Sequence, residues 1–224
     1  MGRAARLAKE QDRALDSLKD VLPGGRFYLA GGGAVGWHLG HRRSHDLDFF
    51  SRDDGVDLAA VRRSLTHRAV GGRIVSASEA SLHLDVGGVA VDIVRYPYPL
   101  LEAPEPGPHG YPIARLRDLA AMKLATIAGR GLRRDFWDLY EILRAGLSID
   151  DAARAYLKRF GIGEPDLYHV TRALAYFADA EQEQTLPEGL STRKWTLIKA
   201  FFLREAPKLL HAPPLSKRGK PRSR

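Results

Sequence analysis

Apolar residues alternate with polar ones over residues 82–86 and again over residues 89–93, on either side of Gly87-Gly88. Alternation of this kind is typical of a strand with one buried face, and a two-residue glycine link between two such runs predicts an antiparallel hairpin. In that hairpin His83 lies opposite Asp92, and both face away from the apolar side. An antiparallel hairpin at this point argues against a repeating βαβ chain.

The other patterns in the first hundred residues are short. Apolar residues spaced three or four apart favour helices, and short apolar runs favour strands. The expected elements are a helix over residues 3–22, a strand over 27–30, a helix over 34–39, a strand over 46–50 and a helix over 57–65.

Five prolines fall between Tyr96 and Tyr111, where a long irregular connection is expected. From Ile113 onward the periodicity is helical, and the expected helices cover residues 115–128, 133–145, 149–159, 165–181 and 191–204. The expected organisation is therefore a strand-rich domain over residues 1–100, a Pro-rich connection over 101–112, a helical domain over 113–210 and a basic, disordered tail over 211–224.

Composition narrows the classes of function. The chain has no cysteine, which excludes disulfides, thiolate metal sites and cysteine nucleophiles. No apolar run approaches the roughly 18 residues needed to cross a bilayer, so we expect no membrane association and a cytoplasmic location. The net charge of +8 favours a polyanionic partner such as RNA. The basic tail either contacts that partner or only adds solubility.

The run Gly31-Gly32-Gly33 follows an expected strand, and Asp46 and Asp48 follow on the next one. Glycines allow a phosphate to approach the backbone, and carboxylates at positions i and i+2 of a strand share one face. Such a pair suits Mg²⁺ or Mn²⁺ and the phosphates of a nucleoside triphosphate (NTP). The alternatives are a plain glycine turn and a carboxylate pair that binds Arg42, Arg43 or solvent.

Asp92 can supply a third carboxylate from the neighbouring strand, either as a metal ligand or as a general base for an attacking hydroxyl. Its alternative is an ordinary pairing with His83 or Arg95. The run from Gly31 to Gly36 also matches the G-x-G-x-x-G dinucleotide fingerprint, but the expected hairpin does not fit the parallel sheet of that fold.

Cations follow in the helical half. Lys123 lies in the middle of an apolar helical stripe, where its ammonium needs an anion such as a triphosphate unless it reaches solvent at the stripe's edge. Arg130, Arg133 and Arg134 either bind phosphates or form an exposed basic rim. Asp135 and Asp138 open the next helix, where the helix dipole alone favours acidic residues.

These segments together resemble the nucleotidyltransferase toxins of the AbiEii/AbiGii type, which belong to type IV toxin–antitoxin and phage-defence systems. The resemblance spans residues 28–140. It rests on Tyr28-Leu29-Ala30-Gly31-Gly32-Gly33, on Leu39-Gly40-His41-Arg42-Arg43-Ser44-His45-Asp46-Leu47-Asp48-Phe49-Phe50, on Val91-Asp92-Ile93, on Ala121-Met122-Lys123-Leu124 and on the stretch from Arg130-Gly131 to Arg134-Asp135-Phe136-Trp137-Asp138-Leu139-Tyr140.

The resemblance implies an α+β fold, with a polymerase-β-like nucleotidyltransferase domain whose mixed sheet is flanked by helices, followed by a helical domain. It implies that Asp46 and Asp48 bind metal, and that Lys123 and Asp135 are needed for activity. Two features depart from the family pattern. Gly33 replaces the small hydroxyl residue usual at this position. The third carboxylate is often missing in the family, so the predicted role of Asp92 rests only on its place on the neighbouring strand.

The expected function is Mg²⁺-dependent transfer of a nucleotide from an NTP to an RNA acceptor, with tRNA as the first candidate, by a toxin with a cognate antitoxin. Gly31, Gly32, Gly33, Lys123 and Arg130 are expected to bind the NTP. Three alternatives stay open at this stage: nucleotidylation of a protein hydroxyl, on the antitoxin or another target; a catalytically silent module that binds RNA or a partner; and modification of a small molecule such as an antibiotic.

Overall fold

The computed structural model describes residues 7–23, 25–51, 55–67, 72–163 and 165–210. The basic tail over residues 211–224 therefore lies outside the described residues. Seven strands form one sheet in the order β3-β4-β5-β2-β1-β7-β6. The strands are β1 (Phe27–Leu29), β2 (Leu47–Ser51), β3 (Gly72–Ala77), β4 (Ser81–Val86), β5 (Val89–Val94), β6 (Glu105–Pro106) and β7 (Pro112–Ile113).

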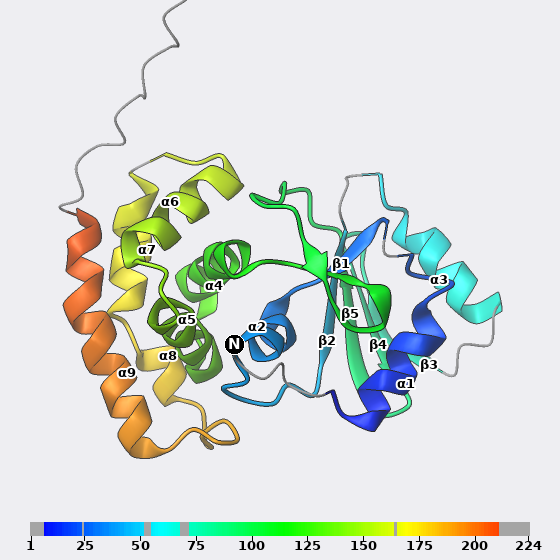
Figure 1. Cartoon of the computed structure of the whole chain (residues 1–224), viewed down its shortest axis with the longest axis horizontal. Coiled ribbons are helices and arrows are strands. Elements are labelled where there is room, and N and C mark those ends of the chain that lie inside the picture. Colours follow the sequence, from blue (N-terminus) through cyan, green and yellow to red (C-terminus); the bar gives the residue numbers. More distant parts are fainter. Residues whose placement is uncertain (1–6, 24, 52–54, 68–71, 164, 211–224) are drawn as a thin grey trace, which may run out of the picture.

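Helices cover both faces of the sheet. Figure 1 shows α1 and α3 on one side of it, and α2 with the helices from α4 onward on the other. The helices are α1 (Lys9–Leu18), α2 (Gly31–Leu39), α3 (Leu58–His67), α4 (Leu116–Arg130), α5 (Arg133–Arg144), α6 (Ile149–Phe160), α7 (Asp166–Leu174), α8 (Ala178–Glu181) and α9 (Thr192–Glu205), with short 3₁₀ helices η1 (Pro108–Gly110) and η2 (Ala206–Leu210). The mixed sheet with its helical C-terminal part confirms the α+β expectation.

The hairpin forms in the predicted register. Val86 pairs with Val89, and His83 pairs with Asp92, across the antiparallel strands β4 and β5. Strand β2 runs parallel to β5 on its other side, and the register places Asp48 beside Asp92. Two carboxylates that are 44 positions apart in the sequence are therefore neighbours in the sheet.

Other elements correct the sequence prediction. Strand β3 was not expected, because every residue of this edge strand is exposed and no alternation marks it. The Pro-rich connection was expected to be irregular, but its two-residue strands β6 and β7 extend the sheet beyond β1. The helix expected over 165–181 is divided into α7 and α8, and the helix expected from residue 34 already begins at Gly31. Runs of two residues are too short to give a periodic pattern.

Capping residues explain where two of the C-terminal helices begin. The Ser148 hydroxyl accepts a hydrogen bond from the backbone N–H of Asp151 at 3.0 Å, and the Ser191 hydroxyl accepts one from Lys194 at 3.2 Å. Serine at this position satisfies one of the backbone donors that a helix start leaves without a partner. Helices α6 and α9 accordingly begin within one residue of their predicted starts.

A buried ion pair ties the helical half to the sheet. Arg159 on α6 binds Asp118 on α4, and both side chains are fully buried. Arg159 also donates to the Tyr28 hydroxyl on β1 at 2.8 Å, and Asp118 accepts the backbone N–H of Leu101 at 2.9 Å. One hydrophobic core runs through both halves. The boundaries of separate domains stay a prediction, but this shared core fixes where the two halves place their side chains.

The imidazole of His109 fastens η1 to α1. Its Nε2 lies 2.8 Å from Asp12 Oδ1 and its Nδ1 lies 2.8 Å from Asp16 Oδ1. These bonds raise the pKa of His109 above its usual value, and the bond to Asp12 has the largest effect. Partial burial opposes the shift. A raised histidine pKa gives stability that is complete below the pKa of the unfolded chain and is lost as the pH rises through the folded pKa.

We therefore expect His109→Asn to lower the melting temperature most near pH 6, and progressively less as the pH rises towards 9. Asparagine tolerates the positive φ of 55° at this position, so the backbone is not the cause of the loss. Thermal unfolding of both proteins across this range measures the difference. A difference that stays constant from pH 6 to 9 would contradict the raised pKa of His109.

Among the described helices, none combines the length and the apolar character that a bilayer crossing requires.

Candidate active site

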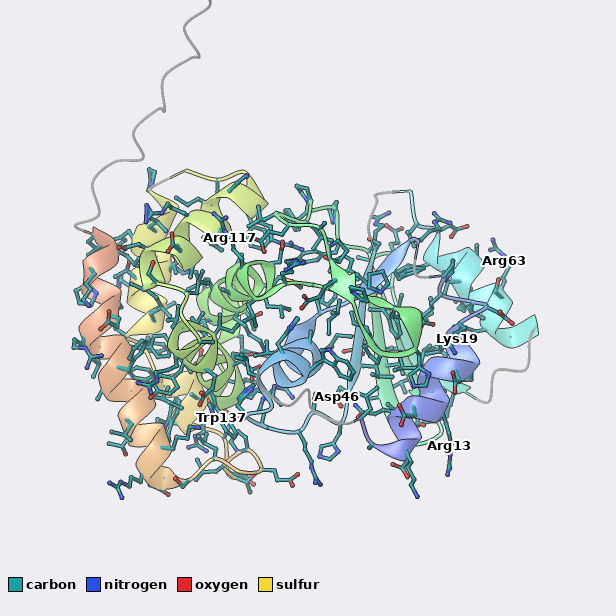
Figure 2. The ribbon with its side chains drawn as sticks, in the orientation of Figure 1. Arg13, Lys19, Asp46, Arg63, Arg117 and Trp137 are labelled. Carbon is teal, nitrogen blue, oxygen red and sulfur yellow. The ribbon has the colours of Figure 1, made fainter. Side chains whose placement is uncertain are left out.

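A cleft of about 220 Å³ separates the sheet and the start of α2 from helices α4 and α5. In Figure 2 Asp46 lies beside α2, near the start of β2. Every predicted site residue except Gly33 lines this cleft. They are Gly31, Gly32, Asp46, Asp48, Asp92, Lys123, Arg130 and Asp135.

The carboxylates come from two neighbouring strands. Leu47 and Phe49 point into the core, so the alternation of β2 directs Asp48 to the opposite face. Asp46 immediately precedes β2, and its Oδ2 lies 4.0 Å from Arg134 Nη1. Asp92 lies next to Asp48 in the parallel register, and its Oδ1 is 2.5 Å from His83 Nδ1.

These charges change the acidity of Asp48. Burial raises the pKa of Asp48 to about 6; Lys123 opposes the rise, whereas Asp92 and Asp46 add to it. An elevated pKa means that the carboxylate lacks enough positive charge nearby to favour ionisation. The donor set therefore fits a cation.

The chemistry of the donors indicates which cation fits. Mg²⁺ takes oxygen ligands and usually binds through one or two carboxylates together with substrate phosphates and water. In the described part of the chain no three acidic or histidine side chains are placed to hold a metal ion by themselves. Asp46 and Asp48 are the residues that would hold Mg²⁺ here, and the role of Asp92 as a further ligand stays a prediction.

The glycine run has a different local role from the predicted turn. The three glycines form the first turn of α2, and Gly31 has a φ of +65°. A Cβ atom at Gly31 would overlap the Asp48 carboxylate, and one at Gly32 would overlap the Arg42 guanidinium. Gly33 faces the carbonyl oxygen of Asp46 and does not reach the cleft. The first two glycines make room for the side chains of the site.

We expect Gly31→Ala to abolish activity, with Gly87→Ala as its matched control. Both glycines have φ near +60°, so alanine should cost each protein about 1–2 kcal/mol of stability. Only the Gly31 methyl group meets Asp48, whereas nothing lies within 4 Å at Gly87. Nucleotidyl transfer by the two variants, measured at equal folded fraction, tests this reason. Equal activities would show that the close approach at Gly31 is unimportant.

Lys123 and Asp138 are the centre of a buried charge network on the other wall. The Lys123 ammonium lies 2.9 Å from Asp135 Oδ1 and 2.8 Å from Asp138 Oδ2. Arg42 donates to both oxygens of Asp138, at 2.6 Å from Nε and 2.8 Å from Nη2, and His41 Nε2 lies 2.9 Å from Oδ1. The anion that Lys123 needs is thus already supplied by two carboxylates of α5.

The pKa shifts in the network reflect these contacts. Burial alone would raise the pKa of Asp138, but Lys123, Arg42 and His41 hold it well below its usual value. Burial alone would lower the pKa of Lys123, but Asp138 and Asp135 raise it. Both side chains are therefore charged at neutral pH.

Sequence reasoning missed the importance of Asp138. The helix dipole gave a sufficient reason for an acidic residue there, so the residue was set aside. The available signal was its position one turn after Asp135, which lets both carboxylates reach the same partner.

The three arginines Arg130, Arg133 and Arg134 differ in exposure and in their partners. Arg133 is buried, and its Nη1 donates to the carbonyls of Glu183 at 2.7 Å and Thr185 at 3.2 Å. Arg130 and Arg134 are exposed and line the cleft. Of these three arginines, only Arg130 and Arg134 line the cleft, where they can meet a phosphate.

Comparison with known proteins identifies the family. Residues 66–218 match the family described as nucleotidyl transferase AbiEii toxin of the type IV toxin–antitoxin system. The chain belongs to this family. It is therefore a nucleotidyltransferase toxin of a type IV toxin–antitoxin system, which confirms the family and the enzyme class expected from the sequence. The matched region includes Lys123, Asp135 and Asp138 but begins after Asp46 and Asp48.

Relatives support the same fold. The uncharacterized protein aq_aa25 of Aquifex aeolicus (strain VF5) is 32% identical over 208 residues, which cover 92% of this chain and 98% of that protein. The nucleotidyltransferase toxin MenT4 (Rv2826c) of Mycobacterium tuberculosis H37Rv superimposes with a TM-score of 0.59 at 20% identity, over 92% of this chain and 82% of MenT4. A crystal structure assigned to a nucleotidyltransferase of H. pylori has a TM-score of 0.50 at 16% identity, over 92% and 99% of the two chains.

Proposed function

We propose that this toxin transfers a nucleotide from an NTP to an RNA hydroxyl, with tRNA as the acceptor, in a reaction that depends on Mg²⁺. One observation carries the proposal. The carboxylates of Asp46, Asp48 and Asp92 on the sheet face Lys123 of α4 and the exposed Arg130 across one cleft. Phosphoryl chemistry needs this combination of metal-binding oxygens and cations that hold phosphate.

In the reaction the acceptor hydroxyl forms a bond to the α-phosphorus of the NTP, and the bond from that phosphorus to the bridging oxygen of the β-phosphate breaks. Pyrophosphate carries away the leaving electron pair. Mg²⁺ held by Asp46 and Asp48 would neutralise phosphate charge when bound. Asp92, steadied by His83, accepts the proton that the attacking hydroxyl loses.

Lys123 and Asp135 have separate tasks in this scheme. An ammonium has three N–H donors, and Asp135 and Asp138 use two of them. Among the described residues no further acceptor is bonded to this ammonium, so its third N–H can reach a phosphate of the NTP. Asp135 acts through Lys123, so we assign it as a positioning residue.

Charge favours RNA as the acceptor. The chain carries a net charge of +8, and the exposed Arg130 and Arg134 stand at the cleft. Neutralising backbone phosphates with Lys and Arg supplies most of the non-specific affinity for nucleic acid. The protein-directed alternative, with the antitoxin as substrate, has no comparable support from the cleft.

The test incubates the purified chain with each α-labelled NTP, Mg²⁺ and total RNA, and follows the label after digestion with ribonuclease or protease. We expect label in the tRNA band, removed by ribonuclease and absent with EDTA. Asp46→Asn should be inactive and Asp179→Asn, an exposed carboxylate on α8, should be active. Label that only protease removes would replace the RNA proposal with protein nucleotidylation, and no label with any NTP would contradict the proposal.

A further inference from the structure

A second cavity, of about 370 Å³, adjoins the cleft. The two hollows share Arg42, Ser44, Asp46 and Asp48 as lining residues. The cavity extends from there between α1 and α2, where η1 contributes Pro108 to its wall. His109, next to Pro108, bonds η1 to α1 and so holds this wall in place.

On the α2 side, the cavity is lined by small residues and, one turn further along the helix, by the aromatic ring of Trp37. Gly33, Ala34 and Trp37 follow Ala30 at helical spacing and line the same hollow. The loop that precedes β2 packs directly on this helix, since a Cβ at Gly36 would lie 2.9 Å from the carbonyl oxygen of Arg42. Small side chains at these positions leave the space open.

The remaining lining contains an apolar part, the polar residues Gln11, Ser44 and His45, and a charged rim. The apolar residues Leu29, Leu47 and Ile113 line the cavity from the sheet. Lys9 and Arg43 are exposed cations at the rim. An apolar slot with one aromatic ring suits a flat base, and cations at its mouth suit the phosphate attached to it.

The volumes of the cleft and of the second cavity indicate which part of a nucleotide each can hold. The cleft, at about 220 Å³, falls below the roughly 300–1,000 Å³ typical of small-molecule sites, whereas the second cavity falls within that range. The cleft alone suits a triphosphate better than a whole nucleotide. The larger hollow next to Asp46 and Asp48 is the place for a nucleoside.

We propose that the cavity lined by Trp37 binds the base and ribose of a nucleotide whose phosphate lies at Asp46 and Asp48. This inference rests on the proposed function and names where one of its substrates is held. The nucleoside can come from the NTP or from the 3′ end of the RNA acceptor, and the Michaelis constants for the two substrates distinguish these sources.

The kinetic test compares Trp37→Ala, which removes the ring, Ala34→Leu, which fills the cavity, and Trp37→Phe, which keeps an aromatic ring. Loss of base stacking of about 1–3 kcal/mol corresponds to a rise of about 5- to 150-fold in KM for one substrate. We expect this rise for Trp37→Ala and Ala34→Leu, with kcat changed far less, and near wild-type values for Trp37→Phe. A rise for the NTP assigns the cavity to the NTP, and a rise for RNA assigns it to the acceptor.

A binding test does not depend on activity. Each nucleoside 5′-monophosphate, and a short RNA, is titrated into the full chain while tryptophan fluorescence is followed. We expect saturable quenching in the wild type that is lost in Trp37→Phe, which still contains Trp137 and Trp195. If transfer fails but this quenching occurs, the proposed function falls and the nucleoside site stands. Unchanged KM values in folded variants, together with no quenching, overturn the inference.

Discussion

Replacing Asp138 by Asn will destabilise the protein by about 3–5 kcal/mol and abolish nucleotidyl transfer. Asp138 is fully buried and accepts hydrogen bonds from Lys123 and Arg42, with His41 at 2.9 Å. An amide has the same shape but no charge, so Arg42 would lose its carboxylate partner and Lys123 would keep only Asp135, in a dry environment. Urea unfolding at pH 7.5 measures the loss of stability, and label transfer from NTP measures the loss of activity.

A double-mutant cycle separates the network from a general packing defect. Lys123→Met removes one partner, and its combination with Asp138→Asn removes the pair. If the pair is coupled, the double variant should be more stable than the sum of the two single losses predicts, by about 0.5–3 kcal/mol. A loss below about 1 kcal/mol for Asp138→Asn would show that the network is not what holds the loop after α2, helix α4 and helix α5 together.

Replacing Asp48 by Asn will have opposite effects on activity and stability. Activity should fall at least about a thousandfold, because metal stabilisation of the transferred phosphate contributes several kcal/mol. Stability of the metal-free protein should rise at pH 8 by about 1–3 kcal/mol, because the folded protein raises the pKa of Asp48 from 3.8 to about 6. Active sites often hold such destabilising charges.

The pH dependence follows from the sign of that shift. The folded state binds the Asp48 proton more tightly than the unfolded chain does. The wild type therefore loses stability as the pH rises from about 4 to about 6. Above pH 6 the full penalty is present, and below about pH 4 it disappears. Unfolding of wild type, Asp48→Asn and the control Asp179→Asn at pH 5 and pH 8 measures it. A variant at position 48 that is less stable than wild type at pH 8 would contradict this account.

Local sequence patterns were sufficient to predict those parts of the fold and the site in which the structure of a residue depends on its neighbours in the sequence. The hairpin register from Val86 to Val89 follows from alternation and a two-residue link, and it places His83 opposite Asp92 as predicted. The placement of Asp46 and Asp48 at the cleft was predicted because a strand with a buried face leaves its alternate side chains on the other side. Neither conclusion needs knowledge of distant parts of the chain.

The features that the sequence did not predict depend on contacts between segments that are far apart in the chain. Asp138 meets Arg42 across 96 positions, and no local pattern reveals that pairing. Gly31 on α2 must be glycine because Asp48 on β2 approaches it closely. The run was interpreted as a turn for phosphate, because the local sequence allows both roles. Strand β3 has no buried residue to mark it, so only its pairing with β4 defines it.

The most direct test of the central claim measures metal binding at the carboxylates themselves. Electron paramagnetic resonance of Mn²⁺ titrated into the full chain, with a non-hydrolysable NTP analogue present, reports the ion without requiring turnover. We expect saturable binding by the wild type and by Asp179→Asn, and affinity weakened at least about tenfold in Asp48→Asn. Binding of Mn²⁺ and nucleotide by Asp48→Asn with the affinity of the wild type would contradict the assignment of this cleft as the reaction centre.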